Sequence, residues 1–455
     1  MSLNPARLVD AARLARTVLV FAGARRLSRL GSREALQAHQ CTRLERLRRT
    51  VMSRSPFYQP YAQLPFEQWP IMSKSLWMKH FDQINTAGIA LKDATRVALQ
   101  AETSRDFRGT LRGLAVGLST GTSGSRGVFV ASAAERARWA GVMLAKLLGP
   151  FKWKPLRVAL FLRANNALYE TLGKGPIRFQ FFDLVRPFRE LMRDLEAFAP
   201  TVLVAPPHVL ATAARTSELR IRPSRVISVA EVLDAIDRQA IERGFGVRVE
   251  QIYQATEGFL GATCAHGTLH LNEEYVLFER EWLDTARTRF VPVITDLYRV
   301  TQPVIRYRLD DVLVPRESPC PCGSPLRAID RIEGRESDVL WLPAAQGTTA
   351  MPGATTEPGA AAAVPVFGDV IARVLVRTLP DLIDYSVDEV ESSRWHVGLA
   401  PGPQAGQSTL LRQAIQAMAL SLGASPPEVV IGAPRGESGC KLRRIRGVGA
   451  VCRSF

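Results

Sequence analysis

The chain has 455 residues and a formal net charge of +16, with 46% apolar and 22% charged residues. These proportions are typical of folded globular proteins, and they exclude disorder, collagen and coiled coil for the chain as a whole. The length suits about two or three domains, each able to bury a core.

Positive charge is concentrated at the two ends of the chain. Residues 1–54 contain twelve Arg against three acidic residues, and residues 435–455 contain six basic residues against one acid. The nearly neutral body between them argues against nucleic acid as a partner, because nucleic-acid surfaces are rich in Lys and Arg. The basic ends favour a solvated charged face over contact with an anionic membrane or an acidic partner.

Membrane insertion and secretion are disfavoured by the same N-terminal residues. The longest apolar stretch there, from Thr17 to Ala24, lies between Arg16 and Arg25 and is far shorter than the about 20 residues of a spanning helix. Asp10 interrupts the region that would have to be apolar in a secretory signal. Six Cys without a small-domain framework indicate a reducing compartment. We therefore expect a cytoplasmic protein without stable membrane insertion.

Apolar spacing predicts two helices before residue 54 and then a βαβ pattern. Strands are predicted at residues 157–162, 201–207, 225–230 and 249–257, and helices at 191–198 and 232–246. Strands separated by helices of this length predict a buried parallel sheet, with ligands collecting at the carboxyl ends of the strands.

The composition changes near Pro343 to Ala, Gly, Pro and Thr, which predicts a mobile linker or long loop. A helix, two strands, a helix and a strand follow, the pattern of a small α+β domain. The predicted division is a basic helical segment (1–54), a core domain (55–340), a linker (341–365) and a small mobile domain (366–455).

A Gly-rich loop at residues 118–127, LSTGTSGSRG, is the first candidate binding motif. Its glycines allow tight turns that present backbone N–H groups to phosphate oxygens, and Arg126 adds a positive charge. It lacks the Gly-Lys-Ser/Thr ending of a Walker loop. The candidate residues are Ser119, Thr120, Gly121, Thr122, Ser123, Gly124, Arg126 and Gly127.

Three further motifs follow the loop in order: YQATEG (253–258), VIRYRLDD (304–311) and IEGRESD (332–338). Their types and order resemble the adenylate-forming (AMP-binding) enzyme superfamily, and most closely its phenylacetate coenzyme A ligase type and uncharacterised relatives. SPFY (55–58), WPIMSK (69–74) and PCPCG (319–323) add to the resemblance. It implies an α/β fold: a large N-terminal domain with parallel sheets flanked by helices, and a small α+β C-terminal domain.

The resemblance also implies roles for single residues. The loop would hold the β- and γ-phosphates of ATP, and Tyr253 would flank adenine. Thr256 would bind the α-phosphate and Glu257 would hold Mg²⁺. Asp311 would accept the ribose hydroxyls, and Arg335 would contact the ribose and phosphate side.

GESGCKLRRIRG (436–447) resembles the region with the adenylation lysine, which makes Lys441 the candidate. A mobile ammonium can reach both a carboxylate and the α-phosphate. Cys440 replaces the usual Gly before this Lys, and Ser337 occupies the position of a hinge residue that is often Asp or Lys in relatives.

Cys264, His270, Cys320 and Cys322 follow predicted neighbouring strand ends, and three Cys with one His can form a closed tetrahedral zinc site. Some relatives show the same pattern. A C-x-C pair is less typical than C-x-x-C, and ordinary thiols, with His266 or no nitrogen ligand, remain the alternative.

The acid-binding pocket has the weakest sequence signal. By resemblance, Tyr169, Phe182 and His208 lie in stretches that line the acid site, and aromatic walls would suit an aryl or medium-length acyl acid. His208, after two Pro at a strand end, is the main candidate.

The resemblance predicts a ligase that converts a carboxylic acid and ATP to acyl-AMP and pyrophosphate, and then transfers the acyl group to a thiol. The thiol would be coenzyme A or the phosphopantetheine of an acyl or peptidyl carrier protein. An amine acceptor, a catalytically impaired nucleotide-binding scaffold and a homodimer stay open. The sequence identifies neither the acid nor the pathway.

Overall fold

The computed structural model describes residues 5–28, 30–107, 109–119, 126–148, 156–162, 177–345, 363–391, 393–435 and 443–447. Three groups of predicted residues lie outside these ranges: Thr120 to Gly124, Tyr169 and Lys441. No helix in the described ranges combines the length and the apolar character needed to cross a membrane.

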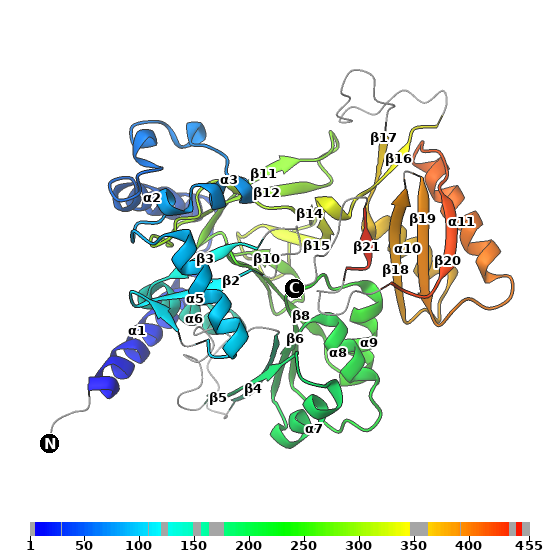
Figure 1. The fold of residues 1–455 in the computed structure, drawn as a ribbon, viewed down its shortest axis with the longest axis horizontal. Helices are drawn as coiled ribbons and strands as arrows, with labels where there is room; N and C mark the ends of the chain where they lie inside the picture. Colours follow the sequence, from blue (N-terminus) through cyan, green and yellow to red (C-terminus); the bar gives the residue numbers. More distant parts are fainter. Residues whose placement is uncertain are drawn as a thin grey trace.

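Within the described residues, a twelve-stranded sheet runs through the larger part of the protein (Figure 1). Its order is β11-β12-β14-β15-β10-β9-β8-β7-β6-β4-β5, and β13 pairs with β12. In sequence order the strands are β4 (Leu156–Leu162), β5 (Ile177–Asp183), β6 (Val202–Ala205), β7 (Arg225–Ser228), β8 (Val249–Ala255), β9 (Gly258–Thr263), β10 (Leu269–Leu271), β11 (Val276–Trp282), β12 (Phe290–Asp296), β13 (Tyr307–Arg308), β14 (Asp311–Pro315) and β15 (Ala328–Arg335).

The strands from β5 to β8 are parallel, as predicted. From β8 onward the sheet is antiparallel, so the fold is mixed α/β rather than parallel throughout. Parallel strands are usually buried on both faces. Phe161 and Leu203 accordingly lie in one core, and their neighbours Leu160 and Val204 lie in the core on the opposite face.

Helices cover both faces of the parallel part. The first core includes side chains of α7, α8 and α9, and the second includes side chains of α1 and α6. Their bounds are α1 (Pro5–Leu27), α6 (Ala133–Leu148), α7 (Phe188–Phe198), α8 (Pro207–Arg215) and α9 (Ala235–Phe245).

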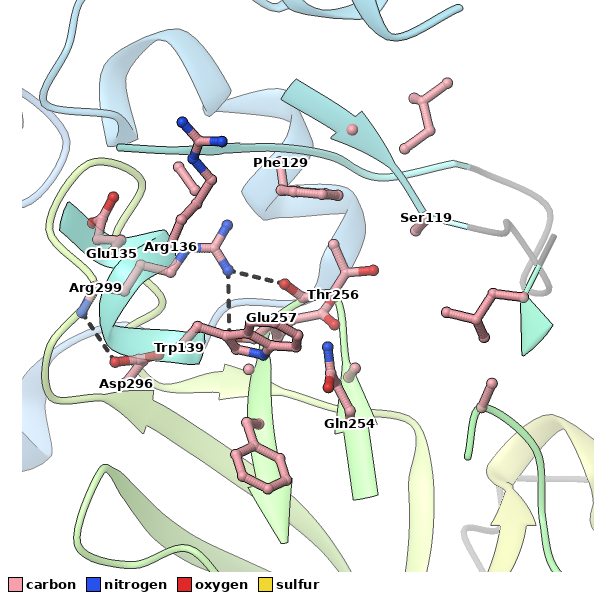
Figure 2. A pocket seen from close by; sticks show the side chains of 18 of the residues that line it. Ser119, Phe129, Glu135, Arg136, Trp139, Gln254, Thr256, Glu257, Asp296 and Arg299 are labelled. Atoms are coloured by element: carbon pink, nitrogen blue, oxygen red, sulfur yellow. Dashed lines mark hydrogen bonds between the residues drawn. The ribbon is translucent and has the colours of Figure 1, made fainter. Parts of the chain in front are cut away.

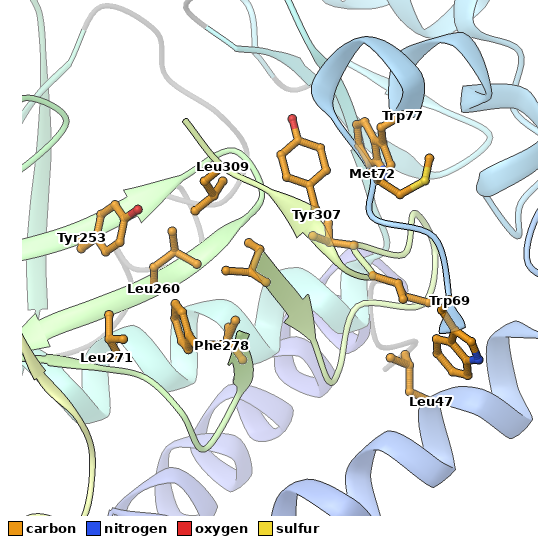
Figure 3. Close-up of a cluster of buried hydrophobic side chains, with 14 of the residues drawn as sticks. Leu47, Trp69, Met72, Trp77, Tyr253, Leu260, Leu271, Phe278, Tyr307 and Leu309 are labelled. Atoms are coloured by element: carbon orange, nitrogen blue, oxygen red, sulfur yellow. The ribbon is translucent and has the colours of Figure 1, made fainter. Parts of the chain in front are cut away.

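The antiparallel part packs against the N-terminal half of the chain. Helix α2 (Arg33–Val51) contributes Leu47 to a core that also contains Trp69, Trp77 and Phe278 (Figure 3). The short helices α3 (Lys74–Lys79) and α4 (Phe81–Ile84) follow Trp69. Residues far apart in sequence thus form one hydrophobic cluster beneath the sheet.

Two basic residues of α2 contact partners within the protein, while Arg46 and Arg49 are exposed. Arg33 donates two hydrogen bonds to the buried carboxylate of Glu273, at 2.6 and 2.7 Å. The Arg43 guanidinium lies 3.8 Å from the ring centroid of Tyr298. The preference for a solvated face is therefore wrong for these two residues, because an amphipathic pattern cannot tell which charged residues meet a buried partner.

A small sheet sets the position of the Gly-rich loop. It contains β1 (Thr110–Leu111), β2 (Leu114–Leu118) and β3 (Val128–Ala131), and it packs against α5 (Leu91–Ser104). Because Leu118 pairs with Val128 across β2 and β3, the loop connects two adjacent strand ends.

The C-terminal part forms a separate small sheet in the order β20-β19-β18-β21, to the right in Figure 1. The two ends of the Ala/Gly/Pro/Thr-rich segment pair as strands β16 and β17, so only residues 346–362 of the expected linker lie outside the described ranges. The elements are β16 (Leu340–Pro343), β17 (Ala363–Val366), α10 (Gly368–Thr378), β18 (Asp384–Glu391), β19 (Arg394–Ala400), α11 (Gln407–Ser421), β20 (Glu428–Gly432) and β21 (Ile445–Arg446).

A buried ion pair joins the two parts. Arg444 donates hydrogen bonds to Asp237 at 2.5 and 3.1 Å and to Asp384 at 2.9 Å. Tyr385 donates to Asp234, at the start of α9, at 2.6 Å. Burial raises the pKa of Asp237, and the Arg444 guanidinium opposes this shift. Arg444 therefore stabilises the ionised form of the buried Asp237 carboxylate.

We expect Arg444→Met to lower the free energy of unfolding by about 3–5 kcal/mol, because Asp237 would be left buried without its cation. Adding Asp237→Asn should recover part of this loss. Arg394→Met, which removes an exposed pair with Glu428, should cost less than about 1 kcal/mol. Thermal unfolding of the variants is the measurement, and equal losses for Arg444→Met and Arg394→Met would contradict the prediction.

Candidate active site

A cavity of about 890 Å³ lies between the large sheet and the C-terminal part. The ends of β8 and β15 and the start of β14 line one side, and residues of α10, β18 and β21 line the other. Six of the predicted site residues line this cavity together: Ser119, Tyr253, Thr256, Glu257, Asp311 and Arg335.

The described ends of the Gly-rich loop are tied together. The Ser119 hydroxyl accepts a hydrogen bond from the Gly127 N–H at 2.7 Å, and the Ser119 N–H donates to the Gly127 carbonyl at 2.7 Å. Arg126 donates to Glu102 on α5 at 2.7 Å and to the Ser119 carbonyl at 3.0 Å. The positive charge that Arg126 was predicted to add to the loop is therefore paired with Glu102.

Asp311 lies at the centre of a hydrogen-bonded group. Tyr253 donates to Asp311 Oδ2 at 2.7 Å, and Arg335 Nε lies 3.9 Å from Asp311 Oδ1. Burial raises the pKa of Asp311 to about 6, with Asp310 adding to the shift and Arg335 opposing it. The pKa of this carboxylate therefore lies above that of an ordinary Asp side chain.

The turn after β8 holds Thr256 and Glu257. Arg299 supports it from behind by donating to the carbonyls of Thr256 at 3.0 Å and Glu257 at 3.4 Å. Its other terminal nitrogen donates to Gln302 at 3.0 Å. The side chains of Thr256 and Glu257 are thereby positioned where the backbone turns at the strand end.

Lys74 also lines the cavity, although the sequence motifs did not indicate a role for it. Its Cε lies 3.6 Å from where a Cβ on Gly127 would be. Burial lowers the pKa of Lys74, and the carboxylate of Glu257 opposes this shift. Its place in WPIMSK was visible, but only the fold brings it beside the loop.

A second cavity, of about 330 Å³, adjoins the first (Figure 2). Both cavities are lined by Ser119, Ala230, Glu231, Gln254, Ala255, Thr256 and Glu257. The walls of the smaller cavity are largely aromatic or apolar, and its polar groups include Glu135, Arg136, Asp296 and Arg299. Two spaces of different chemistry thus meet at the Thr256–Glu257 turn.

The aromatic residues predicted for the acid site lie elsewhere or are not described. Phe182 is 1% exposed, stacks on Phe161 at 4.5 Å and lines neither cavity, so its predicted role is wrong. His208 lines a third, small cavity, and its Nδ1 is 2.6 Å from Glu231 Oε2. It can therefore act on the larger cavities only through Glu231. The aromatic walls come instead from Trp139, Phe129 and Phe259.

The four predicted zinc ligands lie together, with ligand atoms all within 4.8 Å of one another. Cys264 Sγ is 3.7 Å from Cys320 Sγ, and Cys322 Sγ is 3.4 Å from His270 Nε2. A tetrahedral zinc with Zn–S bonds of about 2.3 Å would separate two sulfurs by about 3.8 Å. His270 Nδ1 faces the Leu326 carbonyl at 3.0 Å, which leaves Nε2 as the ligand atom.

The segment after Lys441 returns to the cavity. Arg443 lines it, forms an ion pair with Asp338, and donates to the Ser337 hydroxyl at 3.1 Å. The expected hinge residue thus contacts a residue two positions after the candidate lysine.

No protein-family model and no curated protein matches the chain. A solved structure of 2-hydroxyisobutyryl-CoA ligase in the postadenylation state with 2-HIB-AMP is similar, with a TM-score of 0.64, 16% identity, and 93% of this chain and 92% of that chain covered. The same ligase with 2-HIB-AMP and CoA in the thioesterification state has a TM-score of 0.53 and 17% identity, with 93% of this chain and 91% of that chain covered. The acyl acid amido synthetase GH3.15 has a TM-score of 0.50 and 12% identity, with 88% of this chain and 84% of that chain covered. The chain therefore has the fold of adenylate-forming ligases, which confirms the fold that its motifs predict.

Proposed function

We propose that the protein activates a carboxylic acid with ATP, forming acyl-AMP and pyrophosphate, and transfers the acyl group to a thiol. The observation that carries this proposal is the meeting of two cavities at Thr256 and Glu257. The larger one has charged and hydroxyl groups suited to a nucleotide, and the smaller one has apolar walls suited to an acid.

In the first step a carboxylate oxygen attacks the α-phosphorus, and pyrophosphate leaves. Two anions must approach each other, so cations and preorganised donors are required. Lys74, close to the described end of the loop, and Thr256 are placed to serve the phosphates, and Asp311 is placed to accept the ribose hydroxyls. Glu257 would hold Mg²⁺, which when bound neutralises phosphate charge.

Lys441 is the proposed adenylation lysine. It precedes Arg443, which lines the cavity and contacts Ser337 and Asp338. The TM-score is higher against the postadenylation state of 2-hydroxyisobutyryl-CoA ligase, 0.64, than against its thioesterification state, 0.53. This supports an arrangement of the two parts close to the one used for adenylation.

In the second step a thiolate attacks the acyl carbon and AMP leaves. Coenzyme A and a carrier-protein phosphopantetheine share this chemistry, and an amine would give an amide instead. We propose a thiol because a CoA ligase is among the structures with a similar fold.

We expect acid-dependent exchange of labelled pyrophosphate into ATP with a panel of aryl and medium-chain acids. Glu257→Gln and Lys441→Ala should each lower the exchange rate by about 100-fold or more, because the first removes the carboxylate that would hold Mg²⁺ and the second removes the cation proposed to contact the α-phosphate. Exchange measured by incorporation of label is the readout.

Glu428→Gln and Lys92→Ala are the matched controls, since both residues are exposed. Both should keep full exchange. ATP binding without exchange for any acid would favour the impaired scaffold, and equal losses in the control variants would contradict the assigned roles.

The pKa of Asp311 predicts how ribose binding depends on pH. Because its pKa is raised to about 6, the ionised form that accepts two hydroxyls increases as pH rises through this value. We expect affinity for adenosine, which has no titrating phosphate, to increase from about pH 5 to pH 7. Asp311→Asn should bind more weakly and lack the step, as measured by calorimetry. An identical pH step in Asp311→Asn would contradict the assignment.

We also propose that Cys264, His270, Cys320 and Cys322 bind a structural zinc ion. The sulfur separation and the position of His270 Nε2 beside Cys322 Sγ support it, and four protein ligands leave no position for a reacting water. The ion would tie the β9–β10 turn to the segment between β14 and β15.

The zinc proposal predicts about one zinc per chain by elemental analysis of the purified protein. Cys264→Ser should lose the metal and lower the melting temperature by at least about 5 °C. Cys41→Ser, at an exposed cysteine on α2, should change neither quantity. Protein that neither contains nor takes up zinc would contradict the proposal.

A further inference from the structure

Asp296 places a carboxylate in the smaller cavity. It is the last residue of β12, and it lies deep in the protein with part of its surface still accessible. Because it lines the cavity, that accessible surface is available to a molecule bound there. Figure 2 shows Asp296 on the opposite side of Trp139 from Ser119, which lies where the two cavities meet.

Only one of its two oxygens is used by the protein. Oδ1 accepts hydrogen bonds from the N–H groups of Tyr298 at 2.8 Å and Arg299 at 3.0 Å. Among the described residues, none donates a hydrogen bond to Oδ2, which lies 3.8 Å from where a Cβ on Gly258 would be. Burial raises the pKa of Asp296, because the ionised carboxylate loses contact with water. A hydrogen-bond donor on a bound molecule would offset part of this loss.

Two charged side chains near Asp296, Glu135 and Arg299, already form hydrogen bonds within the protein. Both oxygens of Glu135 accept hydrogen bonds, from the N–H groups of Val300 and Thr301 and from Ser132. Arg299 directs both terminal nitrogens to other protein oxygens. Asp296 Oδ2 is thus an acceptor without a donor among the described residues, whereas both oxygens of the neighbouring Glu135 already accept hydrogen bonds.

The remaining wall limits what can reach this acceptor. Phe129, Trp139, Val142 and Phe259 are apolar or aromatic, and the volume of about 330 Å³ is at the small end of the range for ligand sites. A bound acid therefore needs a compact apolar body.

We propose that the acid substrate carries a hydrogen-bond donor, a hydroxyl or an amino group, on a ring-sized apolar body, and that Asp296 Oδ2 accepts this hydrogen bond. The inference rests on the proposed function, because it takes the smaller cavity as the acid site. Asp296 then determines specificity: an acid without the donor would bury the carboxylate without a partner.

The test uses matched acids with a hydroxyl, amino, methyl or methoxy group at the meta or para position of benzoate, phenylacetate and 3-phenylpropanoate. Binding is measured by calorimetry with AMP present, so that no reaction occurs. We expect at least one of the hydroxyl-substituted or amino-substituted acids to bind the wild-type protein about tenfold or more tightly than the matching methyl-substituted acid.

Asp296→Asn is the informative variant. The Asn side-chain oxygen can still accept from the Tyr298 and Arg299 N–H groups, while its amide turns the second position into a donor. The preference should disappear or reverse toward the methoxy acid, which a purely structural role of Asp296 would not produce. Asp284→Asn is the matched control, because Asp284 also accepts from two backbone N–H groups but lies in an exposed turn. It should keep the wild-type preference.

Equal binding of the hydroxyl and methyl acids, binding of none of them, or an unchanged preference in Asp296→Asn would overturn the inference. A donor preference in binding without any pyrophosphate exchange would leave the inference standing and count against the proposed function. The two failures are therefore distinguishable.

Discussion

The pairing of β14 with β15 is the constraint on which the site depends. It sets Asp311 directly opposite Arg335, while β8 brings the Tyr253 hydroxyl to the same carboxylate. Side chains alternate between the faces of a sheet, so a slip of one residue would turn Asp311 away from Tyr253 and from the cavity. The raised pKa of Asp311 follows from this placement, because the pairing buries the carboxylate beside a single cation.

The Thr256–Glu257 turn extends this constraint into two chemical environments. On one side lie charged and hydroxyl groups, and on the other a cavity with largely apolar and aromatic walls, into which Asp296 brings a carboxylate. The Arg299 side chain donates to the carbonyls of Thr256 and Glu257 in the turn. The backbone N–H of Arg299 donates to Asp296. The position of the turn and the shape of the smaller cavity are therefore coupled through a single residue.

Charged contacts across the larger cavity hold the C-terminal part in place. Arg444 reaches Asp237, and Arg289 and Arg331 reach Asp369 at the start of α10. Such contacts are directional and can exchange partners, whereas the separate hydrophobic core of the C-terminal part keeps that part folded. Ile236 of α9 also belongs to that core, so the interface combines these charged contacts with an apolar one.

Local sequence determined much of this protein. Apolar runs separated by helical segments predicted the parallel strands and their helices. The short motifs predicted Tyr253, Thr256, Glu257 and Asp311, which lie at or beside strand ends. Only the tertiary structure decided which other side chains face the cavities. Phe182 and Trp139 are both aromatic residues in apolar stretches, yet one is core and the other is wall. Lys74, Asp296 and Arg299 were missed for the same physical reason: their neighbours come from distant segments, and packing between segments leaves no local pattern.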